Sequence, residues 1–164
     1  MKDHYHDILQ GFTVEELCVD DKAKQAIKAC AELMLNTSVD FATATSLATL
    51  LMAHLKHIEP SEAFVEVCEE NTPRYYSGEV TYVAFFLLYL CEKARMLNNI
   101  LYEKHFGCQA ACFLLKCADD LDVCDKCGEK AGRQIPIDQA SYDNVPPFHL
   151  GCRCRTHMAQ RYPA

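Results

Sequence analysis

The sequence lacks the short motifs that mark the common enzyme classes. It has no Gly-rich loop for binding phosphate, no serine in a nucleophile elbow, and no pair of carboxylates in an obvious catalytic setting. Each of these motifs places a reactive or charged group where a substrate can reach it. Their absence favours a protein without a catalytic centre.

Long apolar segments are missing too. The run from Val80 to Cys91 is apolar nearly all round, but it measures only about twelve residues, whereas a helix that crosses a bilayer needs about twenty. Residues 1–10 contain no apolar core of the kind that secretion signals carry. We therefore expect a cytoplasmic protein that has no membrane partner.

Basic residues are outnumbered by acidic ones. The chain has 16 Lys and Arg against 23 Asp and Glu, which gives a formal net charge of -7. Most of the acidic excess lies before Ala118, and an acidic surface repels the phosphates of nucleic acids. Nucleic acid is therefore not an expected partner.

What the chain does have is helical periodicity over its first two thirds. Apolar residues recur at steps of three and four over residues 22–35 and 39–57, and a shorter helix is expected over 61–70. A long helix is predicted over 78–106. Half of all residues are apolar, so a sizeable core can form. The fold class predicted is mainly α, a bundle of four to five helices followed by a small β module.

The remaining residues predict a small sheet. Residues 108–118 alternate like a buried strand, and further extended pieces are expected at 134–137 and 153–157. The inward residues of the first strand would be Ala111, Phe113 and Leu115. Such a sheet is too small to be stable unaided. We divide the chain into a helical domain, 1–106, and a small metal-binding module, 107–164.

Five soft ligands in the module have the spacing of a zinc site. Cys124 and Cys127 form one Cys-x-x-Cys pair, and His149, Cys152 and Cys154 form a second cluster. Zinc needs four ligands, so one of the five stays out. We favour His149 as a ligand and place Cys152 ahead of Cys154, because His-x-x-Cys has the spacing of a metal-binding knuckle. A closed site of four protein ligands predicts structural Zn²⁺.

The cysteines leave other interpretations open. A redox pair at Cys124 and Cys127 should begin a helix, but Gly128 and Gly132 follow directly. Structural disulfides fit poorly with an odd total of 11 cysteines and the absence of a secretion signal. The seven other cysteines are interpreted as small buried apolar residues. These are Cys18, Cys30, Cys68, Cys91, Cys108, Cys112 and Cys117.

The order of motifs resembles the end of the phage Mu F-like minor head proteins, over roughly residues 97–158. That family commonly reads Cys-x-x-Cys, a glycine with an apolar strand, and Pro-Pro-x-His-Pro-x-Cys-Arg-Cys. This chain has Pro146-Pro147-Phe148-His149 followed by Cys152-Arg153-Cys154. Leu150 stands where the family usually has proline, and the helical part is shorter than the family's capsid-associated region.

The resemblance implies a phage or prophage-derived head-morphogenesis protein that acts through protein contacts. Its partners would be head or portal components, or further copies of itself, and it would be associated with virions if the phage is active. One alternative is a metal-dependent nuclease in which His149 or His157 acts near Asp119 or Asp120. Another is a stand-alone bacterial regulatory module whose helices bind one protein.

Overall fold

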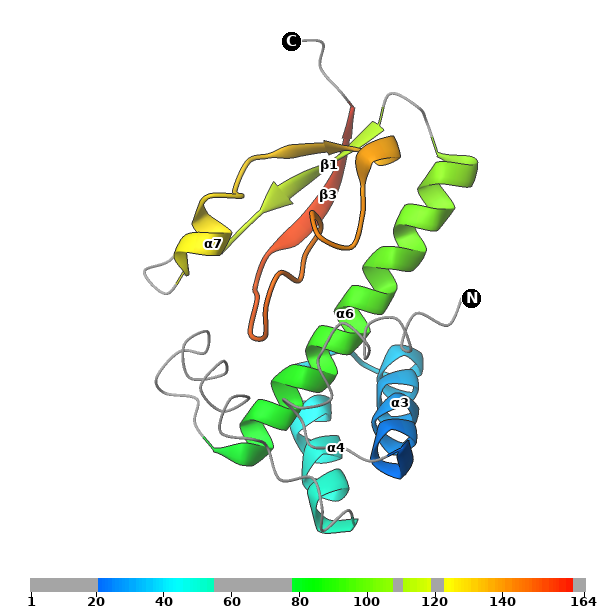
Figure 1. Cartoon of the computed structure of the whole chain (residues 1–164), viewed down its shortest axis with the longest axis vertical. Coiled ribbons are helices and arrows are strands. Elements are labelled where there is room, and N and C mark those ends of the chain that lie inside the picture. The colour runs from blue at the N-terminus through cyan, green and yellow to red at the C-terminus, as the bar shows by residue number, and fades with distance from the viewer. Residues whose placement is uncertain (1–20, 55–77, 108–110, 119–122, 161–164) are drawn as a thin grey trace.

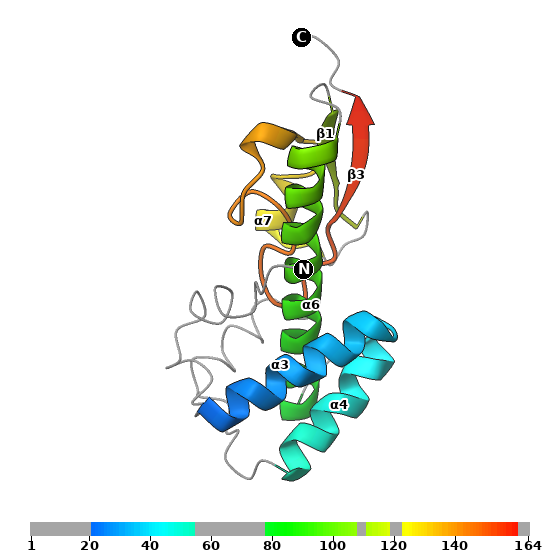
Figure 2. The same ribbon diagram turned by 90° about the vertical axis from the view of Figure 1, so that its right-hand side faces the viewer.

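The computed structural model describes residues 21–54, 78–107, 111–118 and 123–160 (Figure 1). Its longest element is helix α6 (Glu79–Phe106), which confirms the long helix predicted from the sequence. Other helices pack around the first half of α6, and a small sheet lies along its second half (Figure 2). The chain is therefore helix-rich with a small antiparallel sheet, as the sequence predicts.

Helices α3 (Asp21–Asn36) and α4 (Phe41–His54) match the first two predicted helices. The backbone N–H of Thr43 donates to the carboxylate of Asp40 over 2.8 Å, which caps the first turn of α4. Residues 55–57 and the short helix predicted over 61–70 lie outside the described residues. The number of helices in the bundle therefore stays a prediction.

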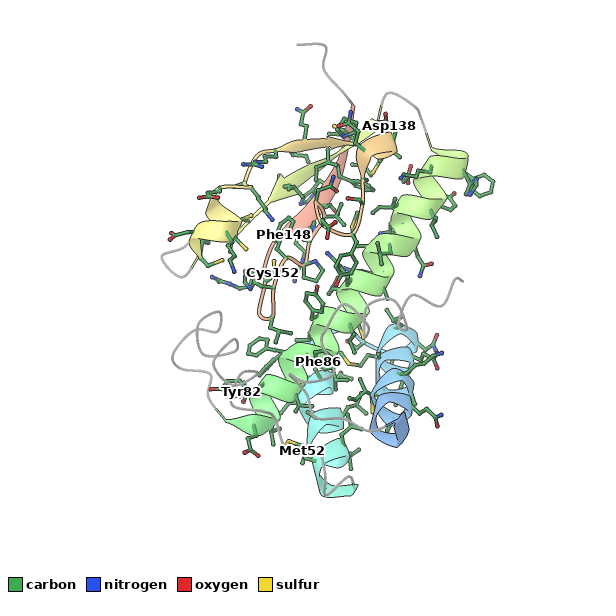
Figure 3. The ribbon with its side chains drawn as sticks, viewed as in Figure 1. Met52, Tyr82, Phe86, Asp138, Phe148 and Cys152 are labelled. Atoms are coloured by element: carbon green, nitrogen blue, oxygen red, sulfur yellow. The ribbon has the colours of Figure 1, made fainter. Side chains whose placement is uncertain are left out.

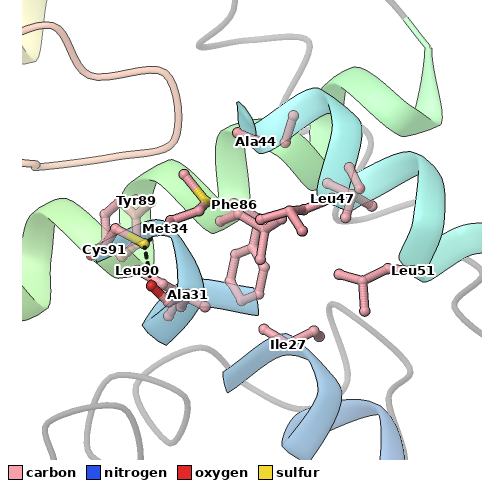
Figure 4. Close-up of a cluster of buried hydrophobic side chains, with 14 of the residues drawn as sticks. Ile27, Ala31, Met34, Ala44, Leu47, Leu51, Phe86, Tyr89, Leu90 and Cys91 are labelled. Carbon is pink, nitrogen blue, oxygen red and sulfur yellow. Dashed lines mark hydrogen bonds between the residues drawn. The ribbon is translucent and has the colours of Figure 1, made fainter. Parts of the chain in front are cut away.

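The three long helices enclose one apolar cluster, here called the helical core. Phe86 of α6 is fully buried between Ile27 of α3 and Leu47 of α4 (Figure 4). Ala44 and Ala48 are also fully buried, and their small side chains let α4 approach α6 closely. Burial of this kind stabilises each large apolar side chain by roughly 1.5–3 kcal/mol.

The apolar stretch of α6 is the centre of this core. Tyr82, Phe86 and Tyr89 are buried, and Phe85 is half-buried. The Cys91 thiol donates to the Ala31 carbonyl over 3.3 Å, and burial raises the pKa of Cys91 to about 12. None of the described helices is both long and apolar enough to span a membrane.

The sheet has three antiparallel strands in the order β2-β1-β3. Strand β1 (Ala111–Lys116) lies in the middle, between β2 (Gln134–Pro136) and β3 (Arg155–Gln160). Phe113 of β1 pairs with residue 135 of β2 and residue 158 of β3. The extended piece predicted at 153–157 therefore begins two residues later and runs three residues further.

The inward face of β1 forms a second cluster, here called the sheet core. It contains the three residues predicted to face inward, and it also contains Met96 and Ile100 of α6. The 3₁₀ helix η1 (Ile137–Gln139) closes one edge of it. Since α6 supplies side chains to both cores, the proposed division at residue 107 falls at the end of a shared helix. That division stays a prediction.

Candidate metal centre

The first knuckle is built by the turn that begins the short helix α7 (Asp125–Gly128). The Cys124 carbonyl accepts hydrogen bonds from the N–H groups of Cys127, over 3.0 Å, and Gly128, over 2.9 Å. This tight turn brings the two thiols to the same side, as metal knuckles do. Cys127 is buried, whereas Cys124 is half-buried.

The second knuckle is a turn from His149 to Cys152. The Cys152 N–H donates to the His149 carbonyl over 3.2 Å, and Gly151 has a φ of 72°, a left-handed conformation that favours glycine. Between them, Leu150 is only 1% exposed and belongs to the helical core. The turn is therefore anchored to the helices by the residue that departs from the Mu F-like pattern.

The two knuckles bring their ligand atoms together. His149 Nε2 lies 3.1 Å from Cys124 Sγ and 3.0 Å from Cys127 Sγ, and Cys127 Sγ lies 3.8 Å from Cys152 Sγ. Two thiolates bound tetrahedrally to zinc are about 3.8 Å apart, and a thiolate and an imidazole nitrogen about 3.6 Å apart. The sulfur pair already has this spacing. The imidazole nitrogen lies about 0.5 Å closer to the two sulfurs than zinc ligands do. Cys152 converges with Cys127 and Cys154 in the other group of candidate ligands, so its sulfur would also have to move toward His149 to complete the site.

The protonation of His149 suits a metal ligand. Its Nδ1 lies 2.6 Å from the Leu150 carbonyl oxygen. A carbonyl can only accept, so Nδ1 carries a hydrogen, and in the neutral ring Nε2 then has the lone pair. Metal-bound histidines usually make such a bond through the nitrogen that does not bind the ion. The lone pair of His149 therefore points at Cys124 and Cys127.

Cys154 lies beside Cys152. The sulfurs of both converge with that of Cys127, and neither belongs to the group formed by Cys124, Cys127 and His149. A hydrogen bond from the Cys154 thiol, helped by backbone groups and by His149, lowers the pKa of Cys152 to about 5. The same bond and burial raise the pKa of Cys154. Cys152 is therefore the more readily ionised of the two cysteines, and the Cys154 thiol donates a hydrogen bond to it.

A buried lysine of α6 holds the loop that leads to His149. Lys93 is only 2% exposed, and its ammonium donates to the carbonyls of Tyr142 over 2.6 Å, Val145 over 2.8 Å and Pro147 over 3.0 Å. Three donors meet three acceptors, which satisfies the buried charge. Burial lowers the pKa of Lys93 to about 8, so it remains largely protonated at neutral pH.

Aromatic contacts fix the same loop from both sides. The Tyr142 hydroxyl lies 3.0 Å from that of Tyr89, and the Lys93 ammonium lies 4.3 Å from the centre of the Tyr142 ring. Beyond the Pro146-Pro147 cis peptide bond, the Lys130 ammonium lies 3.8 Å from the centre of the Phe148 ring. Figure 3 labels Phe148 and Cys152 on the loop that leads into β3. These contacts position the second knuckle against the first.

Sequence reasoning missed two residues beside this cluster. Lys93 was not singled out, although it lies three residues from the buried Leu90 and three from the buried Met96, on the apolar side of α6. Cys117 was interpreted as a buried apolar residue, but its thiol donates to the Cys127 carbonyl over 3.0 Å. The alternation along the strand could have indicated this position, because Cys117 lies on the same face as Leu115.

Other candidate residues are separate from the cluster or lie outside the described residues. His157 is exposed on β3 and belongs to neither of the candidate metal groups among the described residues. Asp119 and Asp120 lie outside the described residues. Cys91 and Cys112 are buried, as the sequence predicts for apolar cysteines.

The arrangement can hold a metal ion. Cys124, Cys127 and His149 form one group of converging ligand atoms, and Cys127, Cys152 and Cys154 form another. Comparison of the chain with family models, with curated proteins and with solved structures finds no match. The function is therefore inferred from the residues of this chain.

Proposed function

We propose that Cys124, Cys127, His149 and Cys152 bind one Zn²⁺ ion with a structural role. The observation that carries this proposal is the convergence of the two knuckles, with the His149 lone pair aimed between two cysteine sulfurs. Thiolate and imidazole ligands suit zinc, and four protein ligands leave no position for a reacting water. The ion would stabilise the module without catalysing a reaction.

The place of the ion in the fold supports a structural role. The first knuckle follows β1, and the second precedes β3, which pairs with β1 along its whole length. An ion shared by the two knuckles would join the segment that follows β1 to the loop that precedes β3. Metal binding would then contribute directly to the folding free energy of the module.

At the level of the whole chain, we infer a protein that acts through contacts with other proteins, as a phage Mu F-like minor head protein. The order of the metal-ligand motifs supports this inference. So does a pair of exposed aromatic side chains near the end of α6, where Tyr102 is 62% and Phe106 78% exposed with ring centres 5.3 Å apart. Exposed apolar side chains that lie together suit a protein interface.

The head role can be tested in the native host. A tagged chain would be followed by quantitative mass spectrometry through a density gradient after induction of resident phages. We expect the chain in a few copies per particle, together with head and portal proteins, and a loss of that association in Cys127→Ser. A chain that stays at the top of the gradient, apart from every particle, would contradict the proposal.

A further inference from the structure

Two cysteines outside the proposed set of zinc ligands face each other across the sheet. Strands β1 and β3 pair down to Lys116 opposite Arg155, so the next step of the register places Cys117 opposite Cys154. Their side chains are hydrogen-bonded to each other. Opposed residues of antiparallel strands have Cα atoms about 4.5–5.5 Å apart, which lies within the range of disulfides.

The two thiols differ in access. Cys154 is only 3% exposed, and its sulfur lies close to those of Cys127 and Cys152. Cys117 is half-buried and lines a surface hollow of about 500 Å³ with Val123, Gly128 and other residues of the β1 end. A small reagent can therefore reach Cys117 from the hollow. Cys154 lines a smaller pocket of about 130 Å³ together with Met96 and Pro147, but its side chain is almost fully buried there.

We propose that Cys117 and Cys154 are a modification site, a thiol pair that small-molecule disulfides such as glutathione disulfide oxidise while the zinc stays bound. The proposal rests on the proposed ligand set, which leaves Cys154 free of the ion. Oxidation would then cross-link the module next to a metal site that keeps its ion and its ligands.

The chemistry takes two exchanges. Cys117 sulfur attacks the small disulfide, the S–S bond of the reagent breaks, and one small thiol leaves with the Cys117 proton. Cys154 sulfur then attacks Cys117 sulfur in the mixed disulfide and displaces the second small thiol, which takes the Cys154 proton. Two protein thiols are oxidised to one disulfide, and one small disulfide is reduced to two thiols.

The disulfide would join the ends of two strands that are already paired. Closing Cys117 to Cys154 would prevent β1 and β3 from separating at the end next to the metal. It would also remove the thiol of Cys154 as a competitor for zinc. We therefore expect the oxidised chain to lose zinc to a chelator at least several-fold more slowly than the reduced chain.

The test treats the zinc-loaded full chain with glutathione disulfide and then alkylates the remaining thiols. Native mass spectrometry would count zinc, and peptide mapping would locate the disulfide. We expect one zinc per chain and a linked Cys117–Cys154 pair. In Cys154→Ser we expect a glutathione adduct that persists at Cys117, and in Cys117→Ser neither adduct nor link. Cys30→Ser, on helix α3, serves as the matched control and should still form the link.

The outcomes separate this inference from the proposed function. Zinc bound with no link, or a link between Cys152 and Cys154, would overturn the thiol pair and leave the structural zinc standing. A chain without zinc that still forms the Cys117–Cys154 link would contradict the zinc proposal alone. Loss of zinc in Cys154→Ser with zinc retained in Cys152→Ser would overturn both the ligand assignment and the pair.

Discussion

Around the first half of α6, nearly all the described buried side chains come from three helices, whereas around its second half they come from α6, strands β1 and β2, and the segment that follows β2. The helical core contains large, fully buried side chains such as Phe86, Leu87 and Leu90. The sheet core is smaller, and two of its buried residues, Met96 and Ile100, belong to α6.

This difference shows two ways of stabilising one small protein. Apolar burial suffices where long helices can pack side by side. Where the chain runs mostly as loops, polar contacts complete the fold instead. Here those contacts are the Lys93 ammonium on three carbonyls and, as we propose, a zinc ion on four side chains. The two halves should therefore respond differently to the same perturbations.

Metal removal should have the largest effect, and it should be confined to the module. We expect Cys127→Ser to bind no zinc and to lose amide protection in β1 and β3, because a structural zinc ion supplies on the order of 10 kcal/mol to small modules. Hydrogen exchange with mass spectrometry would show this, while α3 and α4 keep their protection. Cys30→Ser is the matched control, since it removes a thiol from the helical part.

Equal loss of protection in both halves would show that the helical core depends on the module. Unchanged protection in β1 and β3 would remove the structural role of the metal.

The reverse experiment removes the largest fully buried side chain from the helical core. Phe86→Ala should lower the free energy of unfolding by about 3–5 kcal/mol, because it leaves a cavity among fully buried neighbours. Zinc content should stay at one per chain in the folded protein. Leu50→Ala on the exposed side of α4 should change stability by less than about 0.5 kcal/mol. Urea unfolding with metal analysis would check these values, and loss of zinc in Phe86→Ala would contradict the expected independence.

A smaller effect is expected at the contact between the halves. Lys93→Met keeps most of the side-chain volume but leaves three buried carbonyls without their donor, which should cost about 2–3 kcal/mol. We also expect faster release of zinc to a chelator, since the loop before His149 loses its anchor. Arg95→Met is the control, because Arg95 is exposed on the same helix and forms an ion pair with Glu92 at the surface. Equal behaviour of the two variants would rule out the anchoring role.

The pKa of Lys93 predicts a still smaller effect of pH. Burial lowers it from an ordinary value of 10.5 to about 8, so between these values the unfolded chain holds a proton that the folded chain has lost. Stability due to Lys93 should therefore rise with pH in this window. The difference in unfolding free energy between the natural chain and Lys93→Met should grow from about pH 8 to about pH 10. A difference that shrinks would mean that folding raises this pKa.

The elements with a regular spacing of apolar residues could be predicted from the sequence. Helical periodicity located α3, α4 and α6 to within a few residues, and strand alternation located the inward face of β1. The spacing of cysteine and histidine also identified five residues that the fold brings together. Each of these patterns is local, so a single stretch of sequence contains it.

Contacts made between distant segments escaped prediction. Lys93 has no local signal for its partners, because the three carbonyls lie about fifty residues further along the chain. Cys117 lies opposite Cys154 only because β1 pairs with β3 in one register out of several. The shape of the second knuckle likewise depends on the turn at Gly151 and on the burial of Leu150 in the helical core.

X-ray absorption at the zinc edge of the purified chain tests the central claim most directly, because it counts the atoms bound to the ion. The proposed ligand set predicts three sulfurs at about 2.3 Å and one nitrogen at about 2.0 Å. A shell of four sulfurs would replace His149 with Cys154, and a shell containing a water oxygen would indicate an open site. Either result, or a chain that holds no zinc, would contradict the closed structural site proposed for Cys124, Cys127, His149 and Cys152.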